Sequence, residues 1–179
     1  MIRWIYCLSR SLKSSYYTFL MKRLLSSVGR DTTFEGYVDV PLSNKVIIGD
    51  ECYISAGVSF VVTKSGKLTI GNRVFIGRGS ILASDLSVTI GDNTMLAEYV
   101  SVIDADHVIK RNGIPIRDQG LNPAPVHIGG DVWVGRGCAL LKGVTIGDGA
   151  VIGANSVVTG DIPPFSVAYG SPAKVQKYR

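Results

Sequence analysis

The chain has 179 residues, of which 46% are hydrophobic and 18% charged, so it is long enough for one domain with a sizeable core and unlike a disordered protein. Its net charge of +5 is concentrated in residues 1–30; residues 31–179 carry a net charge of −1 and offer no basic stripe for nucleic acid. No apolar run approaches the roughly 18 residues of a membrane-spanning helix, so an integral membrane protein is not expected.

Residues 1–30 are predicted to form a basic amphipathic helix. They contain six basic side chains and no acidic one. Apolar residues recur there at intervals of three or four: Ile5, Leu8, Leu12, Tyr16, Phe19, Leu20 and Leu24. A helix of this kind suits an anionic membrane surface, where each cation contributes about 1 kcal/mol. The alternative is that its apolar side packs on the repeat domain that follows.

From residue 46 to residue 162, large apolar residues recur at every sixth position. The series is Ile48, Ile54, Phe60; Ile70, Ile76, Leu82; Ile90, Leu96, Val102; Ile128, Val134, Leu140, Ile146, Ile152 and Val158. Neither an α-helix nor an ordinary alternating strand has this period. Glycine follows eight of these fifteen residues, as expected at tight bends. We therefore predict a parallel β-helix of about five coils, each with three short strands.

The series is interrupted after Phe60, Leu82 and Val102, and the last two interruptions are informative. Two extra residues separate Leu82 from Ile90, and Asp85 lies among them. A longer insertion between Val102 and Ile128 predicts a polar loop over 108–125, directly after His107. Excursions from a regular solenoid usually carry function or contact a neighbour.

Other features predict a cytoplasmic location. Basic residues interrupt any signal-peptide core near the N-terminus. The three widely spaced cysteines, Cys7, Cys52 and Cys138, argue against a disulfide framework and agree with a reducing compartment. The second histidine, His127, precedes the inward-facing Ile128, so we place it on an outer face.

Several segments resemble the hexapeptide-repeat acyltransferase family. They are IGGDVWVG at 128–135, GVTIGD at 143–148, VIGANSVV at 151–158 and GSPAK at 170–174. The resemblance implies a left-handed β-helix, usually trimeric, that transfers acetyl groups from acetyl-coenzyme A to a sugar hydroxyl. The segments 104–107 and 114–120 resemble transferases that decorate bacterial surface polysaccharides, whose lipid-linked precursors are built at the inner membrane face. A basic N-terminal helix fits such a location.

Acetyl transfer to a hydroxyl requires a general base and donors for the oxyanion. His107 occupies the family's catalytic position before the loop, and Asp104 and Asp106 could orient its imidazole; a histidine at a turn is otherwise often merely solvated. The resemblance assigns the oxyanion to the backbone amide of Arg136, which could also be an ordinary bend residue. By the same resemblance, Asp85 aligns with an acidic residue that contacts the acceptor sugar, and we place Asp104 on the acceptor side as well, although an aspartate at a turn also commonly bonds nearby amides.

The resemblance also indicates where coenzyme A binds. The expected contacts are Trp133, Gly135, Gly153, Ala154, Thr159 and Lys174. The family often has a lysine after the threonine, whereas Gly160 follows Thr159 here. Phosphate binding therefore depends on Lys174, with Lys177 or Arg179 assisting and Lys142 as a further candidate.

Three other functions compete with O-acetylation. N-acetylation of an amino sugar or another small amine is the main enzymatic alternative, but the related N-acetyltransferases have larger N-terminal domains than thirty residues supply. A zinc enzyme of the carbonic-anhydrase type needs three histidine ligands, and the chain has only His107 and His127, so no metal is predicted. A purely structural β-helix would need neither the histidine-bearing loop nor the coenzyme A tail.

Overall fold

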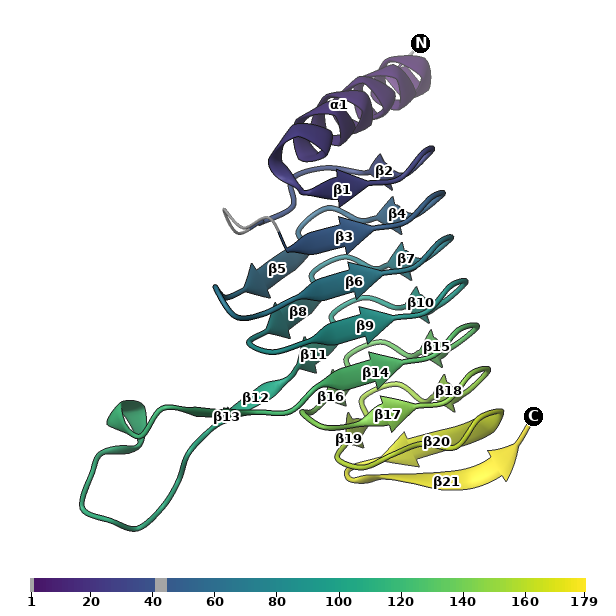
Figure 1. The fold of residues 1–179 in the computed structure, drawn as a ribbon. Coiled ribbons are helices and arrows are strands. Elements are labelled where there is room, and N and C mark those ends of the chain that lie inside the picture. Colours follow the sequence, from purple (N-terminus) through teal and green to yellow (C-terminus); the bar gives the residue numbers. More distant parts are fainter. Residues whose placement is uncertain (1, 41–44) are drawn as a thin grey trace.

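The computed structural model describes residues 2–40 and 45–179 (Figure 1). The chain winds into a β-helix with helix α1 (Ile2–Leu24) at its N-terminal end and a hairpin projecting from its side (Figure 1). At the other end, β20 (Ser166–Gly170) continues the parallel pairing, and the antiparallel β21 (Ala173–Tyr178) covers it.

Three parallel sheets form the sides of the β-helix. Sheet A contains β1 (Ser27–Val28), β3 (Val46–Ile48), β6 (Leu68–Ile70), β9 (Val88–Ile90), β14 (Val126–Ile128) and β17 (Thr145–Ile146). Sheet B contains β2 (Thr33–Phe34), β4 (Tyr53–Ile54), β7 (Phe75–Ile76), β10 (Met95–Leu96), β15 (Trp133–Val134), β18 (Val151–Ile152), β20 and β21. Sheet C contains β5 (Ser59–Val62), β8 (Ile81–Ser84), β11 (Ser101–Ile103), β16 (Ala139–Leu140) and β19 (Val157–Val158).

The predicted architecture is confirmed, but the predicted number of coils is wrong. The coils wind with a left hand, as Figure 1 shows. Every strand of the eight-stranded sheet B except the last runs parallel to its neighbours, which gives about seven coils rather than five. The additional coils lie at the ends, where Phe34 and Ala168 fill the inward positions. The sixfold spacing does reach back through Phe34 to Val28, but the break after residue 40 hides its continuity.

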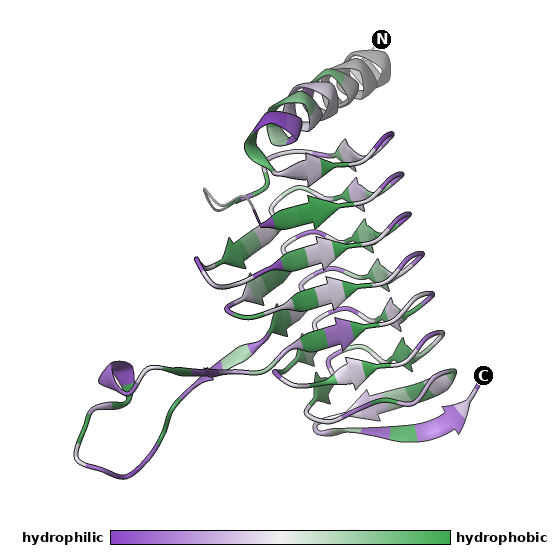
Figure 2. Cartoon of the chain, in the orientation of Figure 1, coloured by the Kyte–Doolittle hydropathy of each residue, from purple (hydrophilic) through white to green (hydrophobic). Residues whose placement is uncertain are grey.

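The repeat places one apolar side chain per strand in the core, and the strands of every coil carry hydrophobic residues (Figure 2). All fifteen predicted inward residues are buried, with at most 3% of their surface exposed. Strand pairing stacks them directly: Ile48 lies beside Ile70, which lies beside Ile90. Burying each such side chain stabilises the fold by about 1.5–3 kcal/mol, so the periodic residues account for the shape of the coil.

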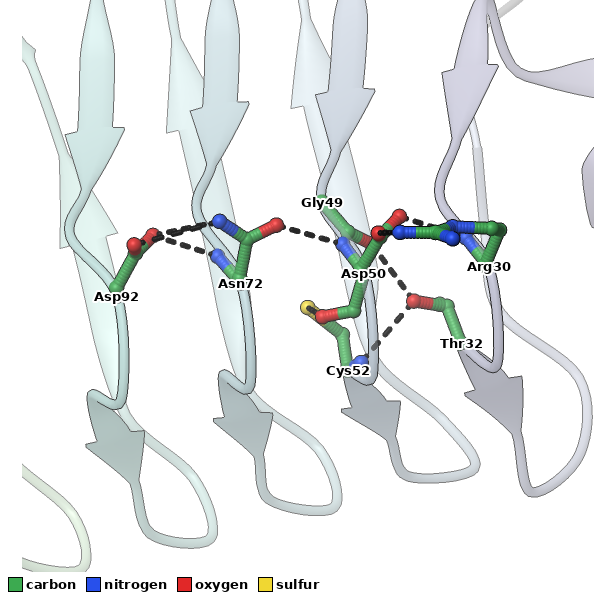
Figure 3. Close-up of polar contacts among 7 residues, drawn as sticks. All are labelled: Arg30, Thr32, Gly49, Asp50, Cys52, Asn72 and Asp92. Atoms are coloured by element: carbon green, nitrogen blue, oxygen red, sulfur yellow. Dashed lines mark hydrogen bonds and ion pairs between the residues drawn. The ribbon is translucent and has the colours of Figure 1, made fainter.

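A ladder of polar side chains fixes the corner between sheets A and B (Figure 3). The backbone N–H of Arg30 donates to Asp50, that of Asp50 to Asn72, and that of Asn72 to Asp92, at 2.7–2.9 Å. The guanidinium of Arg30 also donates to Asp50 at 2.8 Å, and this bond lowers the pKa of the Asp50 carboxyl. A side chain on Gly49 would come within 2.6 Å of Asn72 Oδ1, which explains the glycine before each ladder position.

Helix α1 packs on the first coil. Met21 and Leu25 join the hydrophobic core. The strand β2 ends sheet B, and the helix completes its hydrogen bonds: the Ser14 hydroxyl donates to Phe34 O and the Phe34 N–H donates to Thr18 Oγ1, both at 2.9 Å. The helix thereby protects an edge that would otherwise be open to pairing. No helix in the described part of the chain is long and apolar enough to span a membrane.

Candidate active site

The predicted loop 108–125 is part of an ordered hairpin arm at the corner between sheets C and A (Figure 1). Its base is the antiparallel pair β12 (Ala105–His107) and β13 (Leu121–Pro123), in which His107 lies opposite Leu121. A 3₁₀ turn at Ile116–Asp118 lies farther out. There the Gln119 side chain accepts from Lys110 N and donates to Lys110 O, which ties the two sides of the arm together.

His107 is exposed in a groove of about 720 Å³ at the base of this arm. The other lining residues are Asp106, Val108, Ile109, Lys110, Leu121, Asn122 and Lys142. The Lys142 ammonium donates to Asn122 O at 3.0 Å and lies 3.9 Å from an Asp106 carboxylate oxygen. Lys142 thus anchors the arm to the next coil, a role that the sequence reasoning missed.

Asp104 has a different role from the one expected. Its side chain is 0% exposed, so it does not reach an acceptor in the groove. Its carboxylate accepts from Ser84 Oγ and from the backbone N–H groups of residues 85–87, at 2.7–3.0 Å. Neither Asp104 nor Asp106 hydrogen-bonds the His107 imidazole in the described structure. Asp104 instead fixes the irregular turn that carries Asp85.

Replacing Asp104 with alanine should therefore destabilise the fold. Three part-buried backbone N–H groups would lose their acceptor, and because an unsatisfied buried group costs about 1–3 kcal/mol, we expect a loss of about that size in urea unfolding. The matched control is Asp106→Ala, because that exposed carboxylate makes only a long ion pair. Equal stability of the two variants would contradict the structural role of Asp104.

Asp85 is half-buried at the same corner as the base of the arm, between β8 and β9. Its backbone is held by Asp104 at 2.7 Å. The structure therefore brings the interruptions after Leu82 and Val102 together on one side of the β-helix. Asp85 stays a candidate for contact with an acceptor at this corner.

Arg136 lies at the corner between sheets B and C, in the turn between β15 and β16. This corner is at the opposite edge of sheet C from the arm. Arg136 lines a second groove, of about 450 Å³, with Glu35, Ser55, Arg78, Glu98 and Tyr99. Its guanidinium lies 5.3 Å from the centre of the Tyr99 ring. In the described structure the Arg136 backbone N–H has no hydrogen-bond partner, as an oxyanion donor requires.

A single chain thus does not bring the predicted base and the predicted oxyanion donor together. His107 and Arg136 occupy different grooves, at the two corners that strand β16 connects. In a reaction that uses both groups, one of the two would have to come from another molecule.

The predicted coenzyme A residues are also divided between the corners. Gly135, Gly153 and Ala154 lie at the Arg136 corner, where a side chain on Gly135 would come within 2.6 Å of Ala154 N. Glycine at 135 is therefore also required for close packing of the coils. Thr159 is exposed after β19, on the His107 side. Trp133 is exposed on sheet B, and Lys174 is exposed near the start of β21, the last strand of that sheet.

Other reactive side chains are placed away from this chemistry. His127 lies on the outer face of sheet A, as predicted, with Nδ1 2.7 Å from Thr89 Oγ1. Burial raises the pKa of the Cys52 and Cys138 thiols, so neither is suited to act as a thiolate nucleophile. Among the residues described, no group of three or more histidine, cysteine, aspartate or glutamate side chains could hold a metal ion.

Comparison with families of known proteins gives two matches to the repeats. Residues 125–160 match the bacterial transferase hexapeptide (six repeats). Residues 46–63 and 67–97 match the hexapeptide repeat of succinyl-transferase. Together these matches cover most of the β-helix and agree with the spacing of its buried residues.

Similar proteins include a probable acetyltransferase of Mycobacterium tuberculosis, 40% identical over 75% of this chain and 42% of that protein. The galactoside O-acetyltransferase of Escherichia coli is 35% identical over 72% of this chain and 61% of that protein. The chain thus spans only 42–61% of the length of these curated relatives.

Two kinds of solved structure are similar in fold. A galactoside acetyltransferase in complex with coenzyme A has a TM-score of 0.65 and 31% identity, over 90% of this chain and 68% of that one. An N-acyltransferase, AntD from Bacillus cereus, in complex with dTDP and coenzyme A has a TM-score of 0.80 over 90% of this chain and 88% of that one. At 21% identity, the second likeness concerns the fold alone.

Proposed function

The chain belongs to the hexapeptide-repeat acyltransferase family, and we propose that it transfers an acetyl group from acetyl-coenzyme A to a sugar hydroxyl. The observation that carries the proposal is His107, exposed in a groove at the base of the projecting arm. The similarity to galactoside O-acetyltransferase supports a sugar as the acceptor and oxygen as the acetylated atom.

The proposed reaction assigns one role to each group. His107 accepts the proton of the acceptor hydroxyl as its oxygen attacks the thioester carbonyl. The tetrahedral intermediate places its negative oxygen at the Arg136 backbone N–H, which stabilises it without reorganisation. The intermediate then collapses, the carbon–sulfur bond breaks, and the coenzyme A sulfur receives the proton from the imidazolium. The products are an acetyl ester and coenzyme A.

A homotrimer would complete this site. The His107 groove of one subunit would meet the Arg136 corner of the next, which supplies the group that a single chain leaves at the far end of sheet C. Sheet C also exposes a row of apolar side chains, Val61 and Ile103 on either side of Ala83. Such a row fits a subunit interface better than a solvated face.

The proposed acceptor is a bacterial surface polysaccharide or its lipid-linked precursor, acetylated in the cytoplasm at the inner face of the membrane. The resemblance of residues 104–107 and 114–120 to transferases that decorate surface polysaccharides supports this choice, as does the basic N-terminal helix. N-acetylation of an amino sugar is the second candidate, because an N-acyltransferase shares the fold.

The two candidates are separated by matched acceptors. The full-length protein is incubated with labelled acetyl-coenzyme A and either a galactoside or the same sugar with an amino group in place of one hydroxyl. We expect labelled product from the galactoside, and hydroxylamine should remove the label because it cleaves esters. A hydroxylamine-resistant product formed only from the amino sugar would show N-acetylation instead. Transfer to neither acceptor class across a panel would favour a structural β-helix.

A further inference from the structure

We propose that helix α1 is two-sided: one face packs on the β-helix and the opposite face binds an anionic membrane surface. The sequence presented these as alternatives for a single apolar stripe, whereas the structure separates two sets of residues. This inference does not depend on the proposed transferase reaction.

Between Ser14 and Leu25, one face of the helix, together with the residue that follows it, packs on the β-helix. Met21 and Leu25 are buried in the core, and Tyr17 and Leu20 pack against it. The hydroxyls of Ser14 and Thr18 bond the backbone of Phe34. The helix is therefore held in place without any membrane.

The outer face is apolar and largely exposed; the aromatic contact of Tyr16 is with the neighbouring Tyr17 of the same helix, at 5.4 Å between ring centres. Leu12, Tyr16 and Phe19 are exposed by 65%, 61% and 58%. Their spacing of four and three residues places them on one side of the helix. Leu12 and Met21 are nine residues apart, about two and a half turns, so this strip lies opposite the buried face.

Basic side chains surround the apolar strip. Lys13, Lys22 and Arg23 are exposed, and the Arg23 guanidinium lies 4.5 Å from the centre of the Phe19 ring. Residues 1–30 contain no acidic side chain. An apolar strip with tyrosine and phenylalanine between cations has the properties of a helix that lies in the interface of an anionic bilayer.

A second copy of the chain fits this surface less well. Two copies of the strip placed face to face would bring like charges together. The helix also crosses the end of the β-helix rather than one of its sides (Figure 1). In the proposed trimer with parallel axes, three such helices would lie at the same end, and binding one bilayer through all three would raise the affinity by avidity.

The test uses the full-length protein and sedimentation with lipid vesicles. We expect binding to vesicles that contain phosphatidylglycerol, much weaker binding to pure phosphatidylcholine, and a decline with added salt, because exposed charges are screened within about 8 Å at physiological ionic strength. The triple variant Leu12→Ser, Tyr16→Ser, Phe19→Ser should bind at least tenfold less. Its thermal midpoint should fall only slightly, through lost helix propensity and ring contacts, and its oligomeric state should not change, because the contacts of the helix with the β-helix are intact.

The matched control is Tyr37→Ser, which removes another exposed aromatic ring, outside the helix; it should bind as the unmodified protein does. The proposal would be overturned if the wild-type protein does not sediment with phosphatidylglycerol vesicles, or if the triple variant binds them as strongly as the wild type. Dissociation of the oligomer by the triple substitution would also overturn it and would identify the strip as a subunit interface.

Discussion

Replacing His107 with alanine should lower turnover by about 10²- to 10⁴-fold, the usual share of a general base. The side chain is exposed in its groove and is not part of the core, so the fold and coenzyme A affinity should stay near normal. Coupled detection of released coenzyme A measures turnover, and calorimetry measures coenzyme A binding.

The matched control for this variant is His127→Ala. That imidazole lies on sheet A, beside Thr89. Its removal should leave turnover nearly unchanged. Full activity of His107→Ala would remove this residue from the mechanism, whereas a large loss in both variants would point to a general effect on the assembly.

Replacing Arg136 with proline should lower turnover by about 10²- to 10³-fold, as expected when one oxyanion donor is lost. Proline removes the backbone N–H of interest together with the Arg136 side chain. The local geometry accepts it, because Gly137 has φ of 71° and a turn with positive φ at its third residue favours proline at the second. Steady-state kinetics should show the loss mainly in kcat, since this donor acts in the transition state.

Arg136→Ala separates the amide from the side chain. Alanine keeps the N–H but removes the guanidinium and its contact with Tyr99. We expect turnover near that of the unmodified protein. The assignment fails if alanine is as damaging as proline at unchanged thermal midpoint, or if the proline variant is fully active.

The period of six was sufficient to predict the core, because each inward position must be apolar for the coils to stack. The ends of the β-helix were harder. The inward position of the last parallel strand of sheet B holds Ala168, too small to stand out as part of an aliphatic series. The first coil is separated from the second by the interruption after residue 40. A small inward residue and an interruption of the spacing therefore made the two end coils hard to predict, although both coils pack regularly.

The site was predictable where it depends on the interruption of the repeat. The arm and His107 could be placed from the sequence because extra residues must leave the coil. Asp104 was misassigned because its nearness to His107 in the sequence suggested a shared role. The available signal was that Asp104 lies two residues after the buried Val102. Alternate residues of a strand face the same side, and Asp104 is indeed buried.

The helix shows a different limit. Leu12 and Leu20 belong to one apolar series in the sequence, but only Leu20 packs against the core. Periodicity identifies apolar positions without saying which neighbour covers them. The division of the candidate site between two grooves was invisible for the same reason, since spacing within one chain says nothing about contacts between chains.

The most direct test of the shared site is a mixed assembly of His107→Ala and Arg136→Pro chains. The two variants carry different affinity tags, are produced together, and are purified through both tags, so that every recovered oligomer contains both. Where the intact His107 of one chain faces the intact Arg136 of the other, a complete site forms. The account predicts turnover far above that of either variant alone. Mixed oligomers that are no more active than the two separate variants would show that each chain carries its own site, and would contradict it.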